Sequence, residues 1–206
     1  RYSNDFTEHR IEYSVIEKLI PANAKVIDLG CGSGTLLKNL INSKNISAFG
    51  IDISSSAVDA CKKKGIQAIQ SSIDIILPIE DNSFDYAICN ATIQMVMYPE
   101  ILLKEMKRVA GNLIISFPNF GFYKNRTDML LKGRMPEYML FGYKWFNTGH
   151  IHQLSLKDFE KIVREIGGLD IKSINWVETN NYLKNLITRS FPNLFMLFPI
   201  IQLTKH

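Results

Sequence analysis

Residues 25–35 read KVIDLGCGSGT, and this stretch decides the fold. The short apolar run over residues 25–29 predicts a buried β-strand, since it is bounded by a turn signal. Gly30, Gly32 and Gly34 follow at alternate positions. Glycine lets the backbone take positive φ angles and lets a ligand approach the main chain closely. A strand, a glycine turn and a helix expected over residues 35–42 are together typical of a nucleotide-binding site.

An acidic residue, Asp52, stands at the end of the next predicted strand, about twenty residues after the glycines. A carboxylate at this position accepts hydrogen bonds from both hydroxyls of a ribose. The glycine spacing is G-x-G-x-G, with Thr35 where a dinucleotide-binding fingerprint has its third glycine. The structural alternative is that the glycines only form a tight strand-to-helix turn. Asp28 before the turn and Asp52 after it argue against that alternative.

Apolar runs and amphipathic stretches alternate along the chain. We expect strands over residues 25–29, 46–51, 66–70, 84–89, 113–117, 169–177 and 194–203. We also expect five helices: one that ends before Pro21, one over residues 35–42, one from Ser54 or Ser55 to Lys64, one that begins at Pro99, and one that begins at a capping box of Ser155 and Asp158. Strands separated by helices predict an α/β fold with a mostly parallel sheet and helices on both faces. A length of 206 residues predicts a single domain, residues 1–206.

One segment, residues 119–153, does not fit the alternation. It is rich in aromatic and basic residues and shows no clean period. Loops of this length inside a compact domain are usually functional or disordered, and this aromatic content argues against disorder. We expect residues 119–153 to form an insertion over the ligand pocket.

Composition and charge exclude several classes of protein. Apolar residues make up 46% and charged residues 21%, as in an ordinary globular protein. The formal charge is −3 over residues 1–100 and +7 over residues 101–206, so the second half could face an anion or an acidic partner. Three cysteines without metal-site spacing predict a reduced, cytoplasmic protein with no bound metal. The apolar stretch 191–203 contains two prolines and is too short to span a membrane, and no secretory signal opens the sequence.

The glycine turn and the strand that ends at Asp52 resemble two motifs of a known superfamily. Residues 26–34, VIDLGCGSG, resemble motif I of the class I S-adenosylmethionine-dependent methyltransferases, and residues 50–54, GIDIS, resemble their ribose-binding second strand. Within that superfamily the chain is most similar to the MetW family of methionine biosynthesis. This similarity rests on SFPNFG (116–121), GRMP (133–136), WFNT (145–148), IH (151–152) and PNL (192–194). The resemblance implies a Rossmann-like, seven-stranded sheet whose last strand is antiparallel.

The resemblance also implies roles for individual residues around S-adenosylmethionine. Gly30, Cys31, Gly32 and Gly34 would line its methionine moiety and ribose, Asp28 would orient the loop and the amino group, Asp52 would hold the ribose hydroxyls, and Ile53 would pack on adenine. The adenine contacts fall in Ser72, Ile73 and Asp74, where either Ser72 or Asp74 takes the usual acidic position. Asn90 would offer its backbone carbonyl to the methionine amino group, or it is only a turn residue at the end of a strand.

Methyl transfer from a sulfonium needs alignment and exclusion of water more than a fixed catalytic motif. If the acceptor arrives protonated a base is needed, and His150 and His152 are the candidates because both lie beside the expected pocket. The alternative is that His152 bonds a loop backbone and that His150 is exposed. Residues 149–150 read GH where MetW sequences commonly read Pro-Asn. Residues 90–93 read NATI and lack an N-P-P-[YF] motif, which argues against a nucleic-acid substrate.

Aromatic and basic side chains in the 119–153 segment have two interpretations each. The aromatic ones could cover the site or form plain core, and the basic ones could hold an anionic substrate or partner, or form a solvated face. The side chains that we single out are Tyr123, Tyr138, Tyr143 and Trp145, and Lys124, Arg126, Lys132 and Arg134.

Two functions of different class follow from the resemblance. The first is methyl transfer from S-adenosylmethionine to a small-molecule acceptor, which leaves S-adenosylhomocysteine. The second is a non-catalytic module that docks on homoserine O-acetyltransferase and senses S-adenosylmethionine. A plugged pocket with an exposed apolar patch would favour docking. Residues 195–198, FMLF, could be such a patch, although we expect a buried edge strand with a bulge at Pro199.

Overall fold

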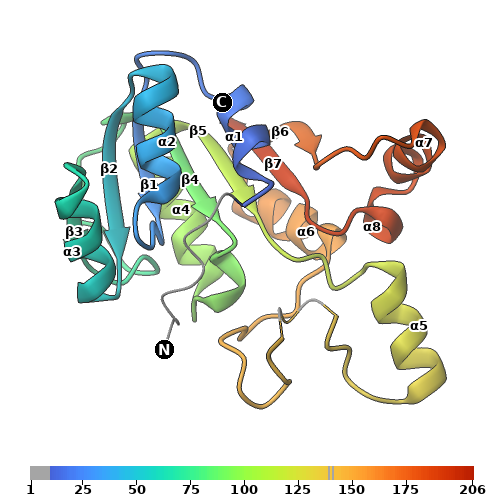
Figure 1. The fold of residues 1–206 in the computed structure, drawn as a ribbon. Helices are drawn as coiled ribbons and strands as arrows, with labels where there is room; N and C mark the ends of the chain where they lie inside the picture. Colours follow the sequence, from blue (N-terminus) through green and yellow to red (C-terminus); the bar gives the residue numbers. More distant parts are fainter. Residues whose placement is uncertain (1–9, 139, 141) are drawn as a thin grey trace.

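The computed structural model describes residues 10–138, 140 and 142–206, and its centre is a seven-stranded sheet (Figure 1). The strands are β1 (Lys25–Leu29), β2 (Ser47–Asp52), β3 (Gln67–Gln70), β4 (Phe84–Asn90), β5 (Ala110–Ser116), β6 (Leu169–Asn175) and β7 (Ile200–Lys205). Their order is β3-β2-β1-β4-β5-β7-β6. Neighbours among β1 to β5 pair in parallel, and β7 pairs antiparallel with β5 and β6. The predicted sheet, with its last strand reversed, is confirmed.

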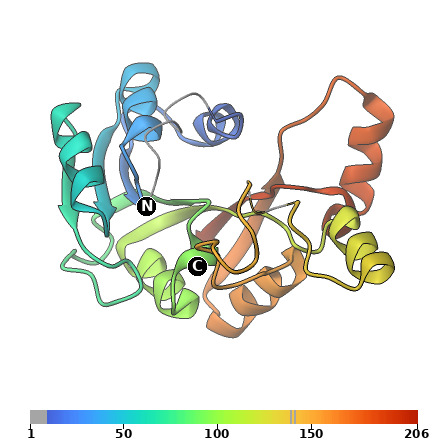
Figure 2. The same ribbon diagram turned by 60° about the horizontal axis from the view of Figure 1, so that its bottom comes forward.

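Helices cover both faces of this sheet (Figures 1 and 2). They are α1 (Tyr13–Leu19), α2 (Thr35–Lys44), α3 (Ser55–Lys63), α4 (Pro99–Val109), α5 (Tyr123–Lys132), α6 (Leu156–Ile166), α7 (Tyr182–Ser190) and α8 (Pro192–Phe195), with a 3-10 turn, η1 (Ile93–Met95). One apolar cluster joins α1, α2 and α3 to side chains such as Val26 and Ile88. A second cluster joins α4 and α6 to the opposite face. The sheet is therefore buried on both sides.

Local sequence signals position these helices. Pro99 is the first residue of α4, and the predicted apolar positions Leu102, Met106 and Val109 are fully buried. The Ser54 hydroxyl accepts a hydrogen bond from the Ala57 N–H at the start of α3. Ser155 and Asp158 form the predicted capping box of α6. The starts of these helices agree with the prediction, because capping depends on residues that are near neighbours in the chain.

The C-terminal region differs from the prediction. Residues 194–203 do not form one strand, because α8 occupies Pro192–Phe195 and β7 begins only at Ile200. Residues 196–199 connect these two elements, and β7 lies inside the sheet between β5 and β6, so the expected edge strand is wrong. The α7 helix was not predicted; it begins where the Asn181 side chain accepts a hydrogen bond from the Lys184 N–H. Pro192 at the start of α8 favours a helical first turn over a strand.

The 119–153 segment contains α5 and then a long connection to α6. Figure 1 shows α5 and this connection on the side of the sheet where the parallel strands end. Four aromatic residues of the segment, the ones singled out from the sequence, are between 37% and 64% exposed, so their interpretation as plain core is wrong: Tyr123, Tyr138, Tyr143 and Trp145. Within residues 10–138, 140 and 142–206, no helix combines the length and apolar character needed to cross a membrane.

Candidate functional site

The glycine turn, residues 30–34, connects the end of β1 to the start of α2 and is fixed to β2. The N–H groups of Gly30 and Cys31 both donate hydrogen bonds to the Ile51 carbonyl, at 2.8 and 3.1 Å. The Gly34 N–H donates to the Cys31 carbonyl at 3.0 Å, which closes the turn. Two parallel strands thus hold the turn at the carboxyl end of the sheet, where α/β proteins bind nucleotides.

Two glycines in the turn are required for different reasons. A Cβ atom on Gly30, whose φ is +86°, would lie 2.5 Å from the Thr92 side chain, so only glycine fits between β1 and the segment after β4. Gly32 also has a positive φ, +52°, but a Cβ there would meet no atom within 4 Å. The Gly32 side of the turn therefore faces open space, as a backbone that receives a ligand requires.

Asp28 lies on β1, two residues before the glycine turn, and is almost fully buried. Among the residues that the structure describes, its Oδ1 is one of few buried side-chain oxygens without a hydrogen-bond partner. Burial, together with the neighbouring Cys61 and Asp52, raises the pKa of Asp28 to about 8. Buried polar atoms normally have partners, so this carboxyl group is suited to receive a donor or a cation from a ligand.

Asp52 ends β2 beside the turn, as predicted. Its Oδ2 accepts a hydrogen bond from the Gly32 N–H at 2.8 Å, and its Oδ1 accepts one from the Ser54 N–H at 2.9 Å. Each carboxylate oxygen can accept a second hydrogen bond, so the group remains available to ribose hydroxyls. Ile53, the predicted adenine contact, is 71% exposed, which leaves its side chain free to be covered by a flat ring.

The predicted adenine-binding residues behave differently from one another. Asp74 is buried, and its Oδ2 accepts hydrogen bonds from the Met97 and Tyr98 N–H groups at 2.9 and 3.1 Å. Its Oδ1 accepts a hydrogen bond from the Ser72 hydroxyl. Burial opposes ionisation of Asp74, but these hydrogen bonds outweigh it and lower the pKa. Asp74 therefore fastens the segment before α4, and Ile73 is buried in the core, where only its backbone can face a ligand.

Asn90, at the end of β4, belongs to a buried polar chain that the sequence analysis missed. Its Nδ2 donates a 3.5 Å hydrogen bond to Glu12 Oε1, and its Oδ1 accepts one from the Ser116 hydroxyl. Glu12 is buried and forms a 2.6 Å ion pair with Arg10. No local signal identifies Glu12, because its contact with Asn90 joins residues 78 positions apart. The Asn90 carbonyl already accepts the Thr92 hydroxyl at 3.0 Å.

The two histidines lie in different surroundings. His152 Nε2 is 3.3 Å from the Met97 carbonyl, and the ring lines a cavity of about 180 Å³ with Ile93, Leu154 and Ile162. This backbone contact is the one expected in the non-catalytic interpretation of His152. His150 is half-buried with its ring edge toward Phe120, and burial lowers its pKa. The alternative in which His150 is exposed is therefore wrong, and the lowered pKa favours the neutral form of the ring.

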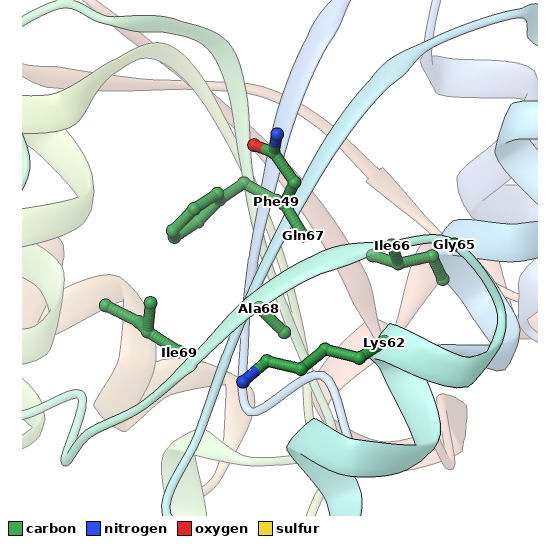
Figure 3. Close-up of a pocket in the computed structure, with 7 residues that line it drawn as sticks. All are labelled: Phe49, Lys62, Gly65, Ile66, Gln67, Ala68 and Ile69. Carbon is green, nitrogen blue, oxygen red and sulfur yellow. The ribbon is translucent and has the colours of Figure 1, made fainter.

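A larger hollow of about 420 Å³ lies elsewhere on the molecule, beside the edge strand β3 (Figure 3). Phe49, Lys62 and residues 65–69 line it, and Figure 3 shows the Lys62 side chain extending along β3. None of the predicted cofactor-binding residues lines this hollow. The candidate site is therefore the glycine turn with Asp28 and Asp52, and not this hollow.

The basic residues of the 119–153 segment are partly engaged with their own neighbours. Lys132 pairs with Asp128, and Lys124 Nζ lies 4.5 Å from the centre of the Tyr138 ring. Arg126 Nε donates a hydrogen bond to the Gly121 carbonyl. These contacts are exposed to solvent, where single ion pairs contribute little stability, so the side chains can exchange them for an anionic ligand or partner.

Comparison with known proteins identifies the family of this chain. The profile of the family described as "Methionine biosynthesis protein MetW" matches residues 10–201. This chain belongs to the MetW family. A relative in Rhodopirellula baltica, the bifunctional methionine biosynthesis protein MetXA/MetW, is 31% identical over 183 residues, which cover 84% of this chain. The MetW-family chain spans 29% of the length of that relative.

Two more distant similarities concern methyltransferases. A demethylmenaquinone methyltransferase of Staphylococcus aureus is 24% identical over 81% of this MetW-family chain and 78% of its own length. The crystal structure of a Thermotoga maritima S-adenosylmethionine-dependent methyltransferase, described as a possible histamine N-methyltransferase, superimposes with a TM-score of 0.67. It is 21% identical, over 95% of this chain and 87% of the other. The fold is thus the Rossmann-like fold of these methyltransferases.

Proposed function

We propose that this MetW-family protein binds S-adenosylmethionine at the glycine turn and transfers its methyl group to a small-molecule acceptor. The observation that carries the proposal is the buried Asp28 Oδ1, which has no partner within the described residues and precedes by two residues the glycine turn with the open backbone of Gly32. S-adenosylmethionine carries a sulfonium and an ammonium group, and a cation favours the ionised form of a neighbouring carboxyl group. The site therefore fits the charge of this ligand.

The chain offers contacts for each part of the ligand. Gly30, Cys31, Gly32 and Gly34 would line the methionine moiety and the ribose, with the ribose hydroxyls on Asp52 and adenine against Ile53. The backbone at Ser72 and Ile73 would reach the adenine ring, whereas the Asp74 carboxylate is taken by Met97 and Tyr98. Asn90, with Glu12 behind it, would border the amino group of the ligand.

When bound, S-adenosylmethionine supplies an electrophilic methyl group on its sulfonium. The protein would hold the acceptor in line with that methyl group and exclude water. We assign the covering role to the 119–153 segment of a single domain, residues 1–206. His150 is the candidate base, because burial lowers its pKa and so favours the neutral form, which can accept a proton from the acceptor.

A second candidate function is partnership with a homoserine O-acetyltransferase in the cytoplasm. The relative described as bifunctional MetXA/MetW supports it, since a MetXA part and a MetW part are joined there in one chain. The surface also supports it. Exposed apolar side chains occupy α5 and α7, among them Leu130, Leu131, Leu183 and Leu186. Figures 1 and 2 show α5, α8 and α7 on the same side of the molecule as β6. Exposed apolar groups in such numbers are typical of protein–protein contacts.

One experiment separates the two functions. The purified protein is first titrated with S-adenosylmethionine by calorimetry, and then incubated with methyl-labelled S-adenosylmethionine and a small-molecule extract of its own cells. We expect saturable binding and transfer of label with release of S-adenosylhomocysteine. Binding without transfer, together with co-purification of the acetyltransferase, would replace the catalytic function with the docking function. Absence of binding would refute both, since each depends on the same nucleoside site.

A further inference from the structure

Two cysteines from different elements meet at the glycine turn. Cys31 belongs to the turn and Cys61 to α3, and their Sγ atoms lie 3.7 Å apart. The Cys61 thiol also donates a hydrogen bond of 3.3 Å to the Gly32 carbonyl. The third cysteine, Cys89, lies in the apolar cluster on the opposite face of the sheet. Cys31 and Cys61 therefore lie close to each other, and Cys89 lies apart from both.

We propose that Cys31 and Cys61 form a reversible disulfide under oxidation by a peroxide, and that this bond weakens ligand binding at the glycine turn. The effect on binding rests on the proposed function, whereas formation of the disulfide does not.

A basic side chain next to the pair favours the first chemical step. Lys64 Nζ donates hydrogen bonds to the Ser33 carbonyl at 2.8 Å and to the Thr35 hydroxyl at 3.1 Å, which places its charge at the turn. The hydrogen bond from Cys31 and the charge of Lys64 lower the pKa of Cys61, against the opposing effect of burial. The thiolate is the reactive form of cysteine, so Cys61 is the sulfur that attacks the peroxide.

The reaction balances with hydrogen peroxide as the oxidant. The Cys61 thiolate attacks one peroxide oxygen, the O–O bond breaks, and Cys61 becomes a sulfenic acid while hydroxide leaves. The Cys31 sulfur then attacks the Cys61 sulfur, the S–O bond breaks, and the oxygen leaves as water with the Cys31 proton. Two thiols are oxidised to one disulfide, and one peroxide is reduced to two waters. Cys31 is 8% exposed and Cys61 is fully buried, so the oxidant enters from the Cys31 side.

The bond must displace the glycine turn. A disulfide requires the sulfurs to approach to about 2.05 Å. Each sulfur already packs against glycine backbone, since a Cβ on Gly34 would lie 2.7 Å from Cys61 Sγ and a Cβ on Gly50 would lie 2.7 Å from Cys31 Sγ. The approach also removes the Cys61 hydrogen bond to the Gly32 carbonyl. The backbone that faces the proposed ligand therefore shifts.

The first test maps the bond without any ligand. The reduced protein is treated with hydrogen peroxide, its remaining thiols are alkylated, and a non-reducing digest is read by mass spectrometry. We expect one linked peptide joining Cys31 and Cys61 in the wild type and in the control variant Cys89→Ser, and none in Cys61→Ser. Alkylation of both Cys31 and Cys61 after treatment, or linkage of either to Cys89, would overturn the proposal. The wild type alone decides this, should a variant fold poorly.

The second test measures S-adenosylmethionine affinity by calorimetry before and after peroxide, and again after dithiothreitol. We expect peroxide to raise the Kd of the wild type and of Cys89→Ser by about tenfold or more, with recovery on reduction. The Kd of Cys61→Ser should be the same before and after treatment. An unchanged Kd in a wild type that carries the mapped bond would refute its effect on binding. Reduced protein that binds no S-adenosylmethionine would instead refute the proposed function, while the linked peptide would still establish the disulfide.

Discussion

The carboxylate of Asp52 holds the backbone of Gly32: its Oδ2 accepts the Gly32 N–H at 2.8 Å. This hydrogen bond joins the end of β2 to the glycine turn, whose own N–H groups bond the Ile51 carbonyl on the same strand. The side chain expected to bind ribose is thus also the one that shapes the turn. The proposed site therefore couples ligand binding to the geometry of the turn through Asp52.

Replacing Asp52 tests this coupling. We expect Asp52→Ala to weaken S-adenosylmethionine binding by about 1–3 kcal/mol, because both the Gly32 N–H and the ribose hydroxyls lose their acceptor. Calorimetry measures the change, and Asp59→Ala, which removes an exposed carboxylate of α3, is the control. An affinity equal to that of the wild type would remove Asp52 from the site.

The pKa of Asp28 predicts a pH dependence of binding. Without ligand the carboxyl group stays protonated up to about pH 8, whereas a cationic ligand binds its ionised form. Binding therefore releases a proton, and affinity should rise between roughly pH 6 and pH 7.5, by at most about tenfold per pH unit. In Asp28→Asn, which keeps the shape and cannot ionise, affinity should be weaker and nearly independent of pH. A wild type with the same flat profile would contradict this assignment.

The same residue predicts a pH dependence of stability with the opposite sign. An unfolded Asp28 ionises near pH 4, and the folded residue keeps its proton up to about pH 8. Between these values the folded state binds the extra proton, so the free energy of unfolding should fall as pH rises. Urea unfolding of the ligand-free protein at pH 5 and pH 8 measures this fall. Asp28→Asn should show a smaller one, and an equal fall in both proteins would assign it to other groups.

Asp74 supports the segment before α4. We expect Asp74→Ala to lower the free energy of unfolding by about 1–3 kcal/mol at pH 7, since the Met97 and Tyr98 N–H groups lose their acceptor. Because hydrogen bonds lower the pKa of Asp74, its contribution is present above pH 4 and is lost as pH falls through the lowered value. Denaturant unfolding at pH 7 and pH 3 checks both statements. Equal destabilisation at the two pH values would show that ionised Asp74 is not the cause.

Under the second proposed function, the apolar side chains of α5 and α7 form the surface on which an acetyltransferase would dock. We expect Leu130→Asp and Leu186→Asp each to abolish co-elution with the homoserine O-acetyltransferase of the same organism in size-exclusion chromatography. Ile76→Asp is the control, because Ile76 is as exposed as Leu130, at 83%, but follows β3 on another part of the surface. Retained co-elution in both α5 and α7 variants would place the contact elsewhere. Loss of a homodimer with retained acetyltransferase binding would assign this face to a second copy of the chain.

The sequence by itself determined the α/β fold, the glycine turn and the position of Asp52. Apolar periodicity, proline at the start of α4 and the capping box of α6 all act between residues a few positions apart. Such signals are legible in the order of residues, because the structure they specify is made by near neighbours. The family resemblance added predicted roles for the residues around the glycine turn.

Tertiary structure decided the features that depend on distant residues. The insertion of β7 between β5 and β6, the Asp74 hydrogen bonds to the segment before α4, the Glu12–Asn90 contact and the Cys31–Cys61 pair all join parts of the chain that only the sheet brings together. The α7 helix differs from these, because Asn181 caps it locally and Leu183, Leu186 and Ile187 recur at helical spacing, although these apolar side chains are exposed. Sequence patterns reflect interactions between residues that are near neighbours in the chain, whereas these contacts depend on the order of the strands in the sheet.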